Sequence, residues 1–369
     1  MQDDSQDLSP APHSPILSRM DPPLRWLLGL IGIAILLVII VQGRIFLAPL
    51  AIAILLFSLI TALIDLAGHF RIGSLAMPNW LATVIVSLLS AAVLMALFGI
   101  VSAQINSVVA TASTYTDRSE EAVSALFAWL GADGANAVLA AFRDIDVGAN
   151  LRAVAGSAGN LLISTVLVIL YIGFLFAERP HFGAKFEKLF PDPARAQRLR
   201  HILSAIGRSV RHYVLVKTAV SLATAGVVYA LLLLMGVDFP ETLATLTFFF
   251  NFIPNIGSII ASLLPMLVAL VQFGDWPMAL LVLLGIGVIQ FSIGNIIEPM
   301  LMGRALHLSS LAIILSLTFW GAVWGVVGLF LAVPIMVMVM IVCAHVPGLR
   351  PVAILLSRDG DLTEGGSAA

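Results

Sequence analysis

The fold is decided by residues 242–274, TLATLTFFFNFIPNIGSIIASLLPMLVALVQFG, because these 33 consecutive residues carry no charge. As one straight α-helix they would measure about 50 Å, whereas the hydrocarbon core of a bilayer is about 30 Å thick. Two full crossings with a turn would need about 40 residues or more. The stretch is too long for one crossing and too short for two, so we expect a bent or re-entrant hairpin that breaks at the sequence NFIPNIG, residues 251–257.

A second stretch repeats this pattern nearer the carboxyl end. Residues 308–343 are uncharged for 36 residues, or about 54 Å as a straight helix, and the sequence WGAVWG at 320–325 interrupts them. Broken backbone at membrane depth is tolerated only where protein or a watery cavity covers it, so both breaks indicate a functional site. The ordinary alternative is that large membrane proteins simply contain Gly and Pro in their helices.

The composition indicates a membrane protein along nearly its whole length. Of 369 residues, 60% are hydrophobic and 11% charged, and the mean hydropathy is +1.05; a soluble domain has about 25% charged residues. Six further apolar runs have the length of ordinary spans: 26–43, 45–64, 80–101, 153–177, 218–237 and 276–297. We therefore expect an all-α polytopic membrane protein with about eight membrane-embedded helical segments, two of them broken or re-entrant hairpins.

The distribution of charge predicts the orientation. Residues 178–217 contain nine of the 19 Lys and Arg, whereas residues 102–152 hold six acidic and three basic residues within amphipathic helical stretches. Because cytoplasmic loops carry an excess of Lys and Arg, the first segment should be cytoplasmic and the second external. Counting spans from there places both termini and Arg304 on the cytoplasmic side of the inner membrane. The two hairpins then enter from opposite faces.

This count also gives the domain organisation. The first part comprises a disordered cytoplasmic tail at 1–23, three transmembrane helices in 24–101 and an external amphipathic helical insert at 102–152. A second membrane part follows at 153–345, and a cytoplasmic tail at 346–369. The second membrane part contains a basic cytoplasmic loop at 178–217 and the hairpins at 242–274 and 308–343.

Several function classes lack support in the sequence. Cys343 is the only cysteine, which excludes intramolecular disulfides and thiolate metal clusters. The seven histidines have no metal-ligand spacing, and HExxH, Walker A and GxSxG motifs are absent. No basic run is interleaved with aromatic residues as in RNA-binding proteins. We therefore expect no enzyme activity, no cofactor, no metal and no nucleic-acid partner.

The carboxyl-terminal third resembles the AI-2E family of transporters, named for export of the signal autoinducer-2. Three blocks in family order and spacing carry the resemblance: FIPNIGS at 252–258, GNIIEPMLMGR at 294–304, and WGAVWGVVG at 320–328 with LAVP at 331–334. The resemblance extends over roughly residues 24–345 and implies a transporter or exporter of a small polar molecule in the lipid bilayer, for some relatives a signal such as autoinducer-2 and for others cation–proton antiport coupled to H⁺ or Na⁺. It also implies a homo-oligomer, and in particular a pentamer.

Inverted hairpins meeting near the bilayer midplane are the architecture of secondary transporters, which agrees with transport that does not use ATP. Two other classes remain open at this stage. An intramembrane enzyme would need a nucleophile–base pair or a metal group at depth, and a membrane scaffold or insertion factor would need no solute.

Glu298 is the most informative ionisable residue, because a carboxylate beside hydrocarbon needs a partner or a watery cavity. It follows an apolar helix, and Pro299 and Gly303 predict a bend after it. One interpretation is a group in the transport path that responds to protons or cations. The other is a structural ion pair with Arg304, six residues further on. For Lys217 we expect only that its ammonium group extends towards the lipid headgroups.

The remaining candidates surround the breaks. Asn251, Asn255 and Asn295 could replace the water around a polar solute, or the first two could cap the ends of the broken helix. A helix that restarts after Pro254 would direct free N–H groups at an anionic group. The expected transport path comprises these side chains, Glu298 and Arg304, together with the glycines of the breaks, Gly257, Gly321 and Gly325.

Overall fold

The computed structural model describes residues 22–68, 158–190, 192–302 and 308–360, with scattered helical residues between 84 and 103. The predicted tail at 1–23, the third span at 80–101, the insert at 102–152, Arg304 and the end of the carboxyl-terminal tail lie wholly or mostly outside these residues. The described part is helical, and its only β feature is a single bridge between Leu308 and Ser357.

The chain divides into two compact units, 1–47 and 48–369. The first contains α1 (Pro22–Gln42), and α2 (Arg44–Gly68) begins in it. The second contains, in order, α6 (Ala158–Glu178), η3 (Arg179–His181), α7 (Phe182–Leu189), α8 (Pro193–Leu234), α9 (Pro240–Phe250), α10 (Ile256–Phe273), α11 (Trp276–Ser292), η4 (Ile293–Ile297), α12 (Glu298–Met302), α13 (Ser310–Trp324), α14 (Val326–His345), η6 (Pro347–Leu349) and α15 (Arg350–Leu356).

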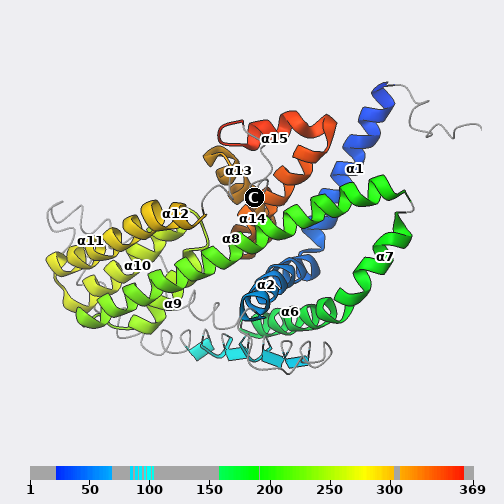
Figure 1. Cartoon of the computed structure of the whole chain (residues 1–369). Helices are drawn as coiled ribbons and strands as arrows, with labels where there is room; N and C mark the ends of the chain where they lie inside the picture. The colour runs from blue at the N-terminus through cyan, green and yellow to red at the C-terminus, as the bar shows by residue number, and fades with distance from the viewer. Residues whose placement is uncertain are drawn as a thin grey trace, which may run out of the picture. The chain divides into compact units, whose positions relative to one another are not determined.

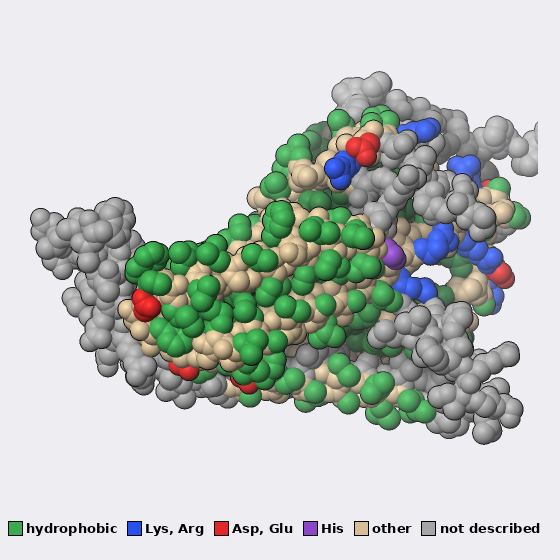
Figure 2. Space-filling view, turned by 60° about the vertical axis from the view of Figure 1, so that its left-hand side comes forward, with side chains coloured by type: hydrophobic (Ala, Val, Ile, Leu, Met, Phe, Trp, Pro, Cys, Tyr) green, Lys and Arg blue, Asp and Glu red, His purple; other side chains and the backbone are tan. Residues whose placement is uncertain are grey.

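The expectation of an all-α polytopic membrane protein is confirmed. Six helices among the described residues are long and apolar enough to cross a bilayer, and two shorter apolar helices lie at Leu27–Gln42 and Ser310–Trp324. Figure 2 shows a broad apolar surface on one face of the molecule, with Lys and Arg side chains gathered at one end of it. The number of crossings and the opposite orientation of the hairpins stay predictions.

The longest helix, α8, organises the second unit. It runs for 42 residues, and its carboxyl-terminal half packs against α9 and α11 (Figure 1). The basic segment expected to be a loop is thus largely helical, because residues 193–217 form the first part of α8 and continue into the apolar span. Asp192 caps the helix by accepting a hydrogen bond from the N–H of Ala194 at 3.0 Å, and no proline interrupts α8 after Pro193 at its first position.

The first long uncharged stretch breaks where the sequence predicts. The helix α9 ends at Phe250 and α10 begins at Ile256. Between them the N–H of Ile256 donates to the carbonyl of Pro254 at 2.7 Å, and Asn255 has φ +61° and ψ −58°. This is the γ-turn with positive φ, a rare and strained conformation for a residue with a side chain.

The second stretch breaks at one residue, Gly325, which separates α13 from α14 and has φ +61° and ψ −136°. The two helices approach closely, since a Cβ atom on Gly328 would lie 1.7 Å from the carbonyl oxygen of Trp320. The hydroxyl of Ser316 on α13 also donates to the carbonyl of Ala332 on α14 at 2.7 Å. Only glycine adopts the Gly325 conformation readily, so this break depends on that residue.

The predicted bend is not found at Pro299, and Gly303, its other predicted position, lies outside the described residues. Residues 276–302 form one continuous helical rod in which α11, the π turn η4 and the short α12 follow one another. Pro299 lies inside α12 instead of ending the helix. The irregularity that the proline requires is placed before it, in the π turn Ile293–Ile297, because membrane helices accommodate a proline by local π adjustments of the backbone.

Candidate functional site

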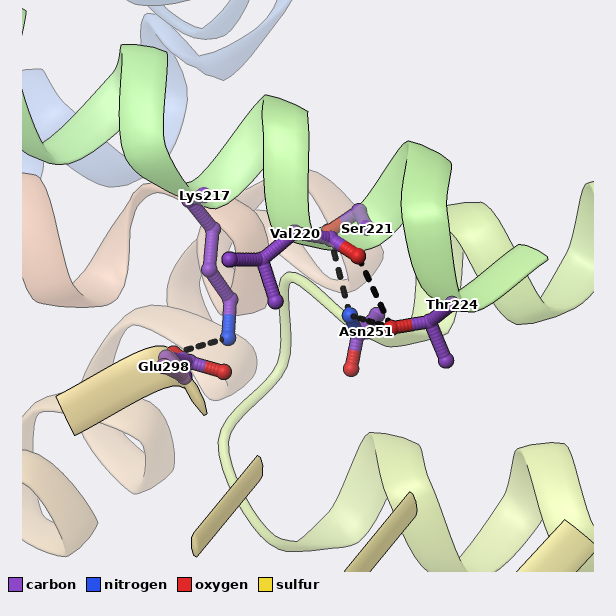
Figure 3. Close-up of polar contacts among 6 residues, drawn as sticks. All are labelled: Lys217, Val220, Ser221, Thr224, Asn251 and Glu298. Carbon is purple, nitrogen blue, oxygen red and sulfur yellow. Dashed lines mark hydrogen bonds and ion pairs between the residues drawn. The ribbon is translucent and has the colours of Figure 1, made fainter. Parts of the chain in front are cut away.

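One face of α8 carries a row of buried polar side chains inside an apolar bundle. Lys217, Ser221 and Thr224 are spaced four and three residues apart, which places them on the same side of the helix. Tyr213, one turn earlier, belongs to the same row and is also buried. Figure 3 shows Lys217, Ser221 and Thr224 facing α12 and the turn between α9 and α10.

The ammonium group of Lys217 forms an ion pair with Glu298 at the start of α12. Its Nζ lies 2.5 Å from Oε1 of Glu298 (Figure 3). The lysine is 4% exposed, whereas the Glu298 side chain is 21% exposed. A buried charge is tolerated only when it is paired, so the ammonium group of Lys217 depends on Glu298.

This pairing corrects the interpretation of Lys217. The residue does not extend towards headgroups; it is buried, because α12 presents a carboxylate to it. Arg304, the expected structural partner of Glu298, lies outside the described residues. The partner found in the structure is instead 81 residues away in the sequence.

Asn251 joins the first break to the same face of α8. Its Nδ2 donates to the hydroxyl oxygens of Ser221 at 3.3 Å and Thr224 at 3.4 Å, and the residue is buried (Figure 3). The capping interpretation is wrong for Asn255, whose side chain makes no capping hydrogen bond. The side-chain amide of Asn251 donates its hydrogen bonds to side chains of α8. The structure thus brings Asn251 and Glu298 to one helix face from two different segments.

The first break also packs against the two helices of the second broken segment. Ile253 of the first break packs in one apolar cluster with Leu317 of α13 and Ala332 of α14. Next to it, the rings of Phe252 and Phe330 stack with centroids 5.2 Å apart and an interplanar angle of 19°. The first break and the two helices α13 and α14 therefore share one apolar cluster.

The remaining predicted site residues do not join the α8 face directly. Asn295 is exposed, and its Nδ2 donates to the carbonyl of Phe291 in its own helix at 3.2 Å. Gly321 lies against Leu329, and Gly325 forms the second break. Their positions are structural in this conformation, whereas Pro254 and Gly257 shape the turn that presents Asn251.

Lys217, Ser221 and Thr224 belong to the site, although they are not among the site residues predicted from the sequence. A signal was present, since a lysine, a serine and a threonine share one face of an otherwise apolar stretch with Tyr213. A polar row of this kind on a membrane helix faces protein or water in preference to lipid. Among the described residues, no group of three His, Cys, Asp or Glu side chains could hold a metal ion.

Apolar helices long enough to span a bilayer, two broken segments and an ion pair between α8 and α12 define a polytopic helical membrane protein with a polar interior. A family model described as AI-2E family transporter matches residues 30–348. The chain therefore belongs to the AI-2E family of transporters, which confirms the resemblance seen in its motifs.

Curated relatives agree with this assignment. The chain is 39% identical over 201 residues to the AI-2 transport protein TqsA of Escherichia coli, which is 54% of this chain and 56% of TqsA. It is 37% identical over 194 residues to a protein of Borreliella burgdorferi, 52% of this chain and 53% of that protein, whose name assigns it to transport without a stated substrate. The chain thus spans a little over half the length of these relatives.

Proposed function

We propose that the protein is a secondary transporter of a small polar molecule, and that the polar face of α8 with Asn251 and Glu298 lies on the path of that molecule. The observation that carries the proposal is the ion pair of Lys217 and Glu298, buried where the first broken segment meets α8. Substrate sites of secondary transporters lie at discontinuous helices, where unwound backbone offers free hydrogen-bonding groups. Membership of a transporter family supports the same role and a non-enzymatic function.

A signal of the autoinducer-2 type is the first substrate to test, because the relative TqsA is named for AI-2 transport. Such a small polar solute suits the hydroxyl, amide and charged groups of the α8 face. Cation–proton antiport is the second candidate, since a partly exposed carboxylate paired with an ammonium group could exchange that group for a metal cation.

The proposal is tested by flux in proteoliposomes of defined orientation, with empty vesicles as the control. Uptake or release of autoinducer-2 above the empty-vesicle rate supports the first candidate. Release of internal protons on addition of external Na⁺, followed with a pH-sensitive dye, supports the second. Absence of both fluxes in a folded protein that expresses normally contradicts transport of either solute and favours the scaffold.

We also propose that the protein lies in the cytoplasmic membrane with both termini and the basic segment 178–217 inside, because this segment holds nine of the 19 Lys and Arg. Single cysteines at Lys188 and Arg304 in a Cys343→Ala background should both resist an impermeant thiol reagent added to intact cells and react after permeabilisation. Labelling of the Arg304 position alone from outside would mean that residues 242–274 cross the membrane once.

Asn255 tests whether the first break contributes a side chain to the path. We expect Asn255→Ala to lower transport strongly, because the amide is lost and alanine tolerates φ +61° less well than asparagine, at a cost of about 1–3 kcal/mol. The matched control is Asn255→Gly, which accepts the backbone conformation and also removes the amide. Proteoliposome flux and thermal unfolding should show Asn255→Gly stable but poorly active. Normal flux through Asn255→Gly would assign to Asn255 only a backbone role.

A further inference from the structure

The helix that carries Glu298 contains a π turn directly before it. This turn, η4, covers Ile293–Ile297. The N–H of Glu298 donates to the carbonyl of Ile293, five residues earlier, whereas an α-helix uses the carbonyl four residues earlier. Single π turns inside α-helices occur frequently at functional sites.

The π turn decides which side chain faces Lys217. One extra residue in a turn shifts every following residue by one position, which corresponds to about 100° around the helix. Glu298 therefore occupies the position that Ile297 would have in a continuous α-helix. In that continuous helix an isoleucine would lie opposite Lys217, and the 4% exposed ammonium group would have lost this carboxylate.

Two residues of the chain favour the wide turn. Pro299 has no N–H, and in a regular α-helix its ring would clash with the carbonyl of Asn295, four residues earlier. The π turn relieves this conflict. Asn295 adds a hydrogen bond from Nδ2 to the carbonyl of Phe291 at 3.2 Å, which ties the turn to the end of α11. A Cβ atom on Gly294 would meet nothing within 4 Å, so a close approach at this glycine does not impose the turn.

We propose that Asn295 and Pro299 are positioning residues that hold the π turn, and that the π turn places the Glu298 carboxylate opposite Lys217. The importance of this placement for transport rests on the function proposed above. Asn295 then acts through the backbone of its own helix and not as a ligand of the solute, which agrees with its exposed position and with the direction of its hydrogen bond.

The register can be measured without transport by cross-linking in a Cys343→Ala background. Lys217→Cys is combined either with Glu298→Cys or with Ile297→Cys, and a bifunctional thiol reagent with a short spacer is added. We expect the pair with Glu298→Cys to cross-link and the pair with Ile297→Cys to react poorly. In the presence of Asn295→Leu and Pro299→Ala the preferred partner should change from position 298 to position 297. Cross-linking that stays at position 298 overturns the proposal.

Deletion of Gly294 is the matched control, because it removes the extra residue and lets a regular α-helix present Glu298 to Lys217. We expect cross-linking to stay at position 298 in this variant even with Asn295→Leu and Pro299→Ala. A loss of cross-linking at 298 after the deletion overturns the proposal, and this comparison stands even where the variant without the deletion fails to fold.

Flux then separates this inference from the proposed function. Asn295→Leu with Pro299→Ala should abolish transport, and the further exchange Ile297→Glu with Glu298→Ile should restore it, because the carboxylate again faces Lys217. If the cross-link moves to 297 and transport is unchanged, the positioning role stands and the role of the ion pair in transport fails. If the cross-link moves and the exchange restores nothing, placement of the carboxylate is not the function of the turn.

Discussion

Glu298→Gln is expected to stop transport in a protein that is still inserted in the membrane. The substitution keeps the shape of the side chain and removes its charge, which leaves the buried ammonium group of Lys217 without the carboxylate at 2.5 Å. Breaking a buried pair by removing one partner costs about 3–5 kcal/mol. Flux in proteoliposomes should fall on the order of tenfold or more, because the carboxylate proposed to lie on the path has lost its charge and the ammonium group facing it is left unpaired. Glu241→Gln, which alters an exposed carboxylate on α9, should leave flux unchanged.

The double variant Lys217→Met with Glu298→Gln separates a role in the path from a role in stability. It removes both charges, so no uncompensated charge is left in the bundle, and replacing a buried ion pair by neutral groups is often neutral for stability. We expect thermal stability to recover and transport to stay low. Recovery of transport together with stability would show that the ion pair only holds α12 against α8.

Gly257→Ala and Gly328→Ala are expected to damage the fold itself. A Cβ atom on Gly257 would lie 1.8 Å from the carbonyl oxygen of Phe250, and one on Gly328 would lie 1.7 Å from that of Trp320. These contacts are with backbone, so relief requires that the two helices of each broken segment move apart. Forcing such a change in a packed interior costs about 1–3 kcal/mol or more.

Thermal unfolding of the purified protein, followed by tryptophan fluorescence or by the soluble fraction after heating, measures this effect. Each variant should lower Tm by roughly 1–4 °C relative to the unmodified chain. Gly287→Ala in α11 is the control, since a Cβ atom there meets nothing within 4 Å. An unchanged Tm for Gly257→Ala or Gly328→Ala would mean that the close approach at that break is not a feature of the protein in the membrane.

The helices and their breaks could be predicted because they depend on local sequence. The thickness of a bilayer limits the length of a helix that crosses it once. The 33 uncharged residues 242–274 are too long for one crossing, and the sequence NFIPNIG within them marks where the helix breaks. Gly325 could be placed at a break for the same reason. The length of α8 could not be predicted from the sequence. The boundary between the basic segment and the span is a change of side-chain polarity, whereas the helical backbone continues through it.

The partner of Glu298 could not be predicted, because pairing depends on how the helices are rotated about their axes. Arg304 is six residues from Glu298, whereas Lys217 is 81 residues away and belongs to another helix. The rotation of α12 is set by one extra residue in the turn before it. Hydrophobic periodicity locates a helix within a few residues, and a single residue of register decides whether Glu298 or Ile297 faces Lys217.

The unbroken length of α8 has a mechanical consequence. Kinks in long helices arise mainly at proline, and α8 contains none beyond its first position, so the helix behaves as a stiff rod. Lys217 lies 24 residues after Pro193, or about 36 Å along the axis. A tilt of about 5° around Lys217 would displace the amino-terminal end by about 3 Å. The helix is thus a lever, and a small rotation at the ion pair is magnified into a movement of the arginine-rich end.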